Sequence, residues 1–196
     1  KNMGIDVCRK EHTYGVDKIN FKLLFFRQTI ELLSDGEFSA VAFRYETGVC
    51  GLKIRNKNCN MVVLPYMGQQ IWFAEFHGKN LTQKSIFDQP QNTTKFGDNY
   101  GGLLIHCGLT NINCADEGED YPLHGELPFA YYPDTYVGIG RDEKGKYLVV
   151  GGTYVYRNSQ EYHYHISQLR LYENSTVAEM HIDIHNRRKS PLDYMF

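Results

Sequence analysis

Apolar and polar residues alternate with a period of two over much of this chain. The clearest run follows Thr176, where one face is wholly apolar and the other polar or charged. The two faces are Ala178, Met180, Ile182 and Ile184 against Glu179, His181, Asp183 and His185. This period is typical of a β-strand, because successive side chains of a strand point to opposite faces. We expect the apolar face to lie on a core and the other to face water or a groove.

The rest of the chain reads as a succession of strands separated by turn signals. Asp35-Gly36 and Thr47-Gly48 stand between β-rich runs, which is a strong local signal for hairpins. The predicted strands are 30–33, 38–45, 49–55, 61–64, 70–76, 147–150, 153–156, 162–171 and 176–184. One helix candidate, 21–33, suits a strand equally well. The pattern predicts an all-β sandwich of antiparallel strands in a single domain, 1–196, without repeats or linkers.

Composition narrows the class of protein. With 196 residues, 42% of them hydrophobic and 22% charged, the chain can form one substantial core, as soluble globular proteins do. A net charge of −2 argues against nucleic acid or a membrane surface as partner. No stretch approaches the roughly 20 apolar residues of a membrane span, and none resembles a signal peptide. Five cysteines without a CxxC pattern indicate reduced thiols in a cytoplasmic protein.

The middle of the chain, 86–128, is rich in Gly, Asn, Asp and Pro and has few alternating runs. A long irregular stretch inside a compact β domain is usually functional. It contains no Gly-rich nucleotide-binding motif and no nucleophile elbow, so nucleotide binding and hydrolase chemistry are not indicated.

The most informative segment is Tyr-Pro-Leu-His-Gly-Glu-Leu-Pro at 121–128. Prolines at both ends predict a rigid loop, and Gly125 allows a close backbone approach. His124 and Glu126 are then two titratable groups in a fixed relation, as acid/base chemistry or binding of sugar hydroxyls requires. The alternative is a proline-bounded turn whose histidine only bonds a backbone carbonyl.

Gln70 and Trp72 are a second candidate pair. On a regular strand they share one face, while Ile71 and Phe73 share the other. An amide beside an indole suits a sugar, with hydrogen bonds to hydroxyls and a ring against C–H faces. Core packing of both residues is the equal alternative.

Histidines on the predicted late strands could bind a divalent metal ion. His163 with His165, and His181 with His185, each share a strand face. A solvated strand face is the favoured interpretation, and we expect no metal. Cys107 follows His106 directly, so the two side chains point to opposite faces, and an inert thiol is favoured over a nucleophile.

Three motifs together resemble the aldose 1-epimerase (galactose mutarotase-like) superfamily. They are Val63–Trp72, Tyr100–Gly108 with its His-Cys-Gly, and Pro122–Pro128. The resemblance implies a twisted antiparallel β-sandwich, the galactose mutarotase-like supersandwich, with a sugar site on a concave sheet face. It also implies an isomerase of carbohydrate metabolism that interconverts the anomers of a free, small-molecule sugar without a cofactor.

The resemblance assigns roles to individual residues. His124 matches the histidine that touches the sugar near the reacting centre, and it is the expected catalytic residue. His106 aligns with a sugar-contacting arginine of better-known members. Glu126 is a candidate sugar ligand that could instead orient His124.

The resemblance also implies that the fold continues past residue 196, with its general acid and base in the later part. We therefore expect this chain to be an N-terminal portion, as Lys1 in place of Met also suggests. Open sheet edges then predict poor solubility or a partner that supplies the rest, and a homo-oligomer is left open. A non-catalytic carbohydrate-binding module and a metal-dependent sugar isomerase are the alternative functions.

Overall fold

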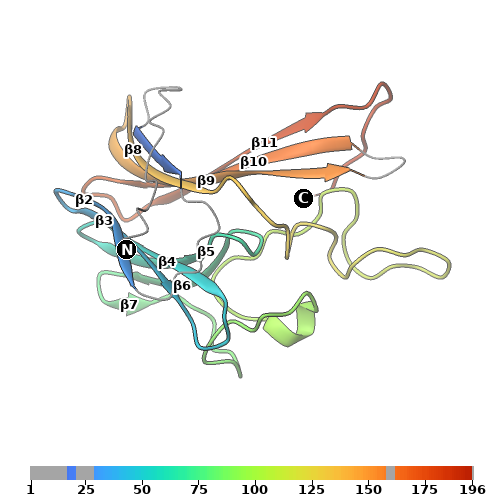
Figure 1. Cartoon of the computed structure of the whole chain (residues 1–196), viewed down its shortest axis with the longest axis horizontal. Helices are drawn as coiled ribbons and strands as arrows, with labels where there is room; N and C mark the ends of the chain where they lie inside the picture. The colour runs from blue at the N-terminus through green and yellow to red at the C-terminus, as the bar shows by residue number, and fades with distance from the viewer. Residues whose placement is uncertain (1–16, 21–28, 158–161, 196) are drawn as a thin grey trace, which may run out of the picture.

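Two antiparallel sheets face each other in the computed structural model, which describes residues 17–20, 29–157 and 162–195 (Figure 1). The six-stranded sheet is a meander in chain order. Its strands are β2 (Ile30–Asp35), β3 (Phe38–Arg44), β4 (Cys50–Arg55), β5 (Cys59–Leu64), β6 (Gln70–Phe76) and β7 (Lys79–Asn80). The two-residue turn between β2 and β3 has Gly36 at a φ of +62°, and a second turn at 46–48 joins β3 to β4. Both hairpin predictions are confirmed.

The five-stranded sheet has the order β1-β8-β9-β10-β11. Its strands are β1 (Asp17–Asn20), β8 (Tyr136–Asp142), β9 (Gly145–Arg157), β10 (Tyr162–Tyr172) and β11 (Ala178–Asn186). The prediction missed β1 and β8, and it divided β9 into two strands. Glycines interrupt the β-rich residues of β8 and β9: a Cβ at Gly140 would lie 2.5 Å from the Tyr147 ring, and one at Gly151 would lie 2.6 Å from the Tyr136 ring. These positions are small because a tyrosine covers each of them.

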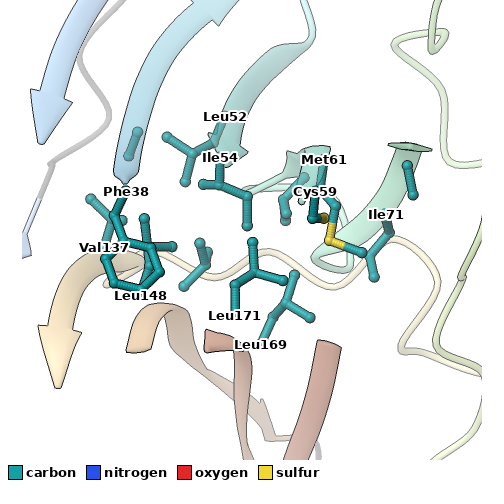
Figure 2. Packing of buried hydrophobic residues seen from close by; sticks show 14 of the residues in the cluster. Phe38, Leu52, Ile54, Cys59, Met61, Ile71, Val137, Leu148, Leu169 and Leu171 are labelled. Atoms are coloured by element: carbon teal, nitrogen blue, oxygen red, sulfur yellow. The ribbon is translucent and has the colours of Figure 1, made fainter. Parts of the chain in front are cut away.

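The core fills the space between the two sheets (Figure 2). Phe38, Leu52 and Ile54 come from the six-stranded sheet, and they meet Val137, Leu148 and Leu171 from the other. Each of these six side chains is at most 1% exposed. Burying a large apolar side chain contributes roughly 1.5–3 kcal/mol, so this layer is a major source of stability. Ala178 and Met180 of β11 pack against it, as the alternation predicts. The predicted all-β sandwich is confirmed.

A β-bulge at Trp72 overturns one detail of the predicted pattern. Val62 pairs with Phe73 and Val63 pairs with Ile71, so Trp72 has no partner in the ladder. The extra residue shifts the alternation. Ile71 and Ala74 belong to the core, whereas Phe73 does not. The expectation that Ile71 and Phe73 share a face is therefore wrong.

The described residues contain no α-helix and only one short 3₁₀ helix, η1 (Phe96–Asn99). Most of the helix candidate at 21–33 lies outside the described residues, and its last part, Ile30–Leu33, is in strand β2. No described helix is long and apolar enough to cross a membrane.

Candidate functional site

The proline-bounded segment 121–128 is a tight turn. His124 has a φ of +64° and Gly125 a φ of +84°, so two successive residues adopt left-handed backbone. The amide of Gly125 donates to the carbonyl of Pro122 at 2.8 Å. A histidine at positive φ is uncommon and costs of order 1–3 kcal/mol, and such strain clusters at functional sites.

Three backbone hydrogen bonds hold this turn against the preceding segment 108–113. The amide of His124 donates to the carbonyl of Asn113, and the carbonyl of His124 accepts from Gly108, both at 2.8 Å. The amide of Leu127 donates to the carbonyl of Gly108, also at 2.8 Å. The backbone of His124 is thus fixed on both sides, and this fixes the direction in which its side chain leaves the chain.

The imidazole of His124 is half-buried and lies against the ring of Phe96 in η1. The two ring centroids are 4.4 Å apart and the planes are inclined by 58°. No pattern in the sequence singles out Phe96, because it stands 28 positions before the histidine in an irregular stretch. His124 is therefore a positioned, partly exposed imidazole beside an aromatic ring.

The carboxylate of Glu126 is hydrogen-bonded to Thr110, which lies in the 108–113 segment. Its carboxylate oxygens accept from the Thr110 amide at 3.1 and 3.3 Å, and from the Thr110 hydroxyl at 3.0 Å. These contacts tie the turn that carries His124 to the 108–113 segment. This favours the second of the two predicted roles, in which Glu126 orients His124 rather than binding a sugar.

Removing this contact should loosen the turn. We expect Glu126→Ala to lower the free energy of unfolding by about 2 kcal/mol, because a charged, partly buried set of hydrogen bonds is lost. Glu126→Gln should cost less than ~1 kcal/mol, since the amide can still accept from Thr110. A double-mutant cycle with Thr110→Val, followed by urea unfolding, measures the coupling. Additive effects of the two substitutions would contradict the contact.

His106 is buried, with 3% of its surface exposed. Burial lowers its pKa to about 4, because a charged imidazole would lose its hydration. At neutral pH it is therefore uncharged and cannot replace an arginine as a cation. It lies two positions before Gly108, just outside the 108–113 segment that holds the His124 turn.

The lowered pKa of His106 predicts a loss of stability in acid. Between pH 6.5 and about 4 the unfolded chain binds a proton at this residue and the folded chain does not. The contribution of His106 to the free energy of unfolding is complete above pH 6.5. It declines as the pH falls to about 4, by up to about 3 kcal/mol in total. Urea unfolding at several pH values should show a shallower acid decline in His106→Asn or His106→Gln. If stability declined with falling pH as steeply in both variants as in the wild type, this effect of His106 would be contradicted.

Gln70 and Trp72 are buried at 1% and 7% exposure. The Gln70 side-chain nitrogen donates to the carbonyl of Pro128 at 2.7 Å, which joins the start of β6 to the end of the proline-bounded turn. Trp72 packs with Val49 and Leu64. The packing alternative describes both residues in this structure, and Gln70 is in addition bonded to the turn.

The histidines of the late strands were the candidates for a metal site. His181 contacts Glu179 at 3.1 Å, and Glu179 also pairs with Lys144 at 2.5 Å, which lowers the pKa of that carboxyl. Among the described residues no group of three or more potential metal ligands lies together. The side chains of His163 and His165 lie outside the described part of the chain.

Burial raises the pKa of the Cys107 thiol, which favours its protonated, unreactive form.

A separate surface hollow of about 430 Å³ lies between the β3–β4 turn and the segment 86–91. None of the candidate site residues lines it. Its lining residues are Glu46, Thr47, Ile86, Phe87, Asp88, Gln89 and Gln91.

Comparison with known proteins supports the fold rather than a particular activity. No protein-family model matches the sequence, and no curated protein matches it either. The structure is similar to the crystal structure of "a putative aldose 1-epimerase" from Klebsiella pneumoniae, with a TM-score of 0.72 and 17% sequence identity. The match covers 85% of this chain and 49% of the other, so this chain spans about half the length of that relative. The chain therefore has a galactose mutarotase-like β-sandwich fold.

Proposed function

We propose that this protein is an aldose 1-epimerase-like isomerase that binds a free sugar and interconverts its anomers, with His124 in contact with the reacting centre. Support comes from the fold it shares with the Klebsiella structure and from the His124 turn. The observation that carries the proposal is the geometry of His124. Its backbone is held in a strained conformation by hydrogen bonds on both sides, and its imidazole stays partly exposed.

The chemistry needs only proton transfers. A base removes the proton of the anomeric hydroxyl while an acid protonates the ring oxygen. The bond from C1 to the ring oxygen then breaks and leaves an open-chain aldehyde. Rotation about the C1–C2 bond and reclosure on the other face of the carbonyl give the second anomer. No electrons or groups are exchanged with another molecule, so the reaction requires no cofactor.

An imidazole suits this reaction, because general acid–base catalysis by a positioned side chain contributes typically about 10²–10⁴-fold in rate. In this proposal His124 exchanges a proton or a hydrogen bond with an oxygen at the reacting centre. Three residues hold the imidazole in place through the backbone of the 121–128 turn and of the 108–113 segment, namely Thr110, Glu126 and Gln70. They are positioning residues.

The test is the rate of anomer exchange catalysed by the full-length protein. Two-dimensional exchange NMR on a panel of aldoses measures the α–β interconversion directly. We expect a rate that rises in proportion to protein concentration for at least one sugar and is unchanged by a chelator. Exchange at the buffer rate for every aldose would refute the isomerase. Binding without exchange would indicate the carbohydrate-binding module, and loss of exchange with a chelator would indicate the metal-dependent alternative.

A further inference from the structure

The surroundings of His124 include a second aromatic ring that no role yet explains. Phe96 contacts the imidazole, and the ring of Tyr100 lies 5.6 Å from that of Phe96, between centroids, at an inclination of 46°. Tyr100 is 50% exposed, although it is a large aromatic residue. Phe96 is half-buried. Phe96 and Tyr100, here called the aromatic ledge, therefore continue from the candidate catalytic imidazole toward solvent.

The ledge is anchored to the body of the protein. Asn99, in the same 3₁₀ helix as Phe96, is 1% exposed and accepts from the Gln91 amide at 2.8 Å. The carbonyl of Tyr100 accepts from the Ser85 hydroxyl, also at 2.8 Å. After the ledge, the amide of Leu103 donates to the carbonyl of Ile71 at 2.8 Å, which ties the segment to β6. The exposed Tyr100 ring is thus carried on a held backbone, and its exposure is not explained by a loose loop.

We propose that the aromatic ledge of Phe96 and Tyr100 is the binding platform for the apolar face of the sugar ring, a proposal that rests on the isomerase function above. One face of a pyranose presents C–H groups, and an aromatic ring covers such a face while hydroxyls at the rim stay hydrogen-bonded. A sugar lying on the ledge would have its edge toward His124, because Phe96 contacts that imidazole.

The charge balance of the chain segments that carry the platform and His124 favours an uncharged sugar. The backbone hydrogen bond from the His124 amide to the Asn113 carbonyl closes the loop 113–124. Within that loop, residues 116–120 carry four carboxylates, and Asp98 lies in η1 itself. Lys95, the residue before Phe96, is a cation close by in the chain. Residues 95–124 therefore contain five acidic side chains and one basic side chain, which disfavours a phosphorylated sugar.

The experiment measures binding without turnover. A methyl glycoside of each aldose has no free anomeric hydroxyl and cannot mutarotate, so saturation-transfer NMR with the full-length protein reports binding alone. We expect the wild type to bind one such glycoside with saturation of its C–H protons. Tyr100→Leu and Phe96→Leu should raise Kd about threefold to tenfold. Tyr100→Phe should bind like the wild type, and the 6-phosphate of the same glycoside should bind more weakly.

Tyr131→Leu is the matched control, because Tyr131 is 40% exposed and its ring lies 6.0 Å from that of Tyr66 in another aromatic pair. Wild-type affinity in both ledge variants would overturn the platform, and tighter binding of the phosphate would overturn the preference for an uncharged sugar. If the glycoside binds through the ledge but no aldose exchanges, the platform stands and the isomerase fails. If aldoses exchange while the ledge variants bind normally, the isomerase stands and the platform fails. If no glycoside binds, the platform is refuted.

Discussion

Replacing His124 should lower kcat/KM for anomer exchange by at least about 100-fold, because a positioned acid–base group contributes roughly 10²–10⁴-fold. Two variants are useful. His124→Asn keeps a residue that tolerates positive φ, and His124→Ala removes the hydrogen-bonding groups of the side chain. The fold should survive in His124→Asn, since the backbone bonds to Gly108 and Asn113 do not involve the side chain. Exchange NMR gives the rate, and circular dichroism gives the fold.

His77 provides the control for this experiment. It is an exposed histidine at a φ of +48° in the turn between β6 and β7, so it shares the backbone conformation of His124 without its surroundings. His77→Asn should retain the wild-type rate. A folded His124→Asn protein that exchanges anomers as fast as His77→Asn would remove His124 from the mechanism.

The second large effect concerns the residue after the histidine. A Cβ at Gly125 would lie 2.2 Å from the Asn111 carbonyl oxygen and 2.5 Å from that of Gly108. Both atoms belong to the backbone that holds the turn and cannot move aside cheaply. Gly125→Ala should therefore destabilise the protein by at least ~3 kcal/mol, combining this clash with the strain of positive φ. Urea unfolding measures the loss, and amide exchange at 106–127 locates it.

Gly118→Ala separates the clash from the strain. Gly118 has a φ of +90°, close to the +84° of Gly125, but a Cβ there would meet nothing within 4 Å beyond its chain neighbours. Its replacement should cost only about 1–2 kcal/mol. Equal losses in the two variants would show that the turn does not pack against 108–111.

Sequence alone predicted most strands of this fold because their signals are local. Alternation in β11 and the glycine turns around β3 depend on neighbours within a few residues. The errors arose where contacts between residues on different strands decide the structure. Gly140 and Gly151 interrupt the β-rich residues of β8 and β9, yet each lies beneath a tyrosine from a neighbouring strand. The bulge at Trp72 likewise depends on the pairing of β6 with β5.

In the candidate site, too, local features could be predicted and contacts between distant segments could not. The proline-bounded turn, and the choice of His124 as a candidate, followed from residue types within eight positions. The contact of Glu126 with Thr110, 16 positions away, and that of His124 with Phe96, 28 positions away, depend on how irregular segments fold back. No periodic pattern encodes such contacts, so the partners of the predicted residues were not predictable. Burial of His106 was hidden for the same reason, and the sequence could not decide between packing and sugar binding for Gln70 and Trp72.

The most direct test is a crystal structure of the full-length protein with a bound aldose. We expect a sugar whose anomeric hydroxyl or ring oxygen lies within hydrogen-bonding reach of the His124 imidazole. A sugar bound in the hollow at Glu46 and Gln91, with His124 contacting only protein, would contradict the proposed role of this histidine.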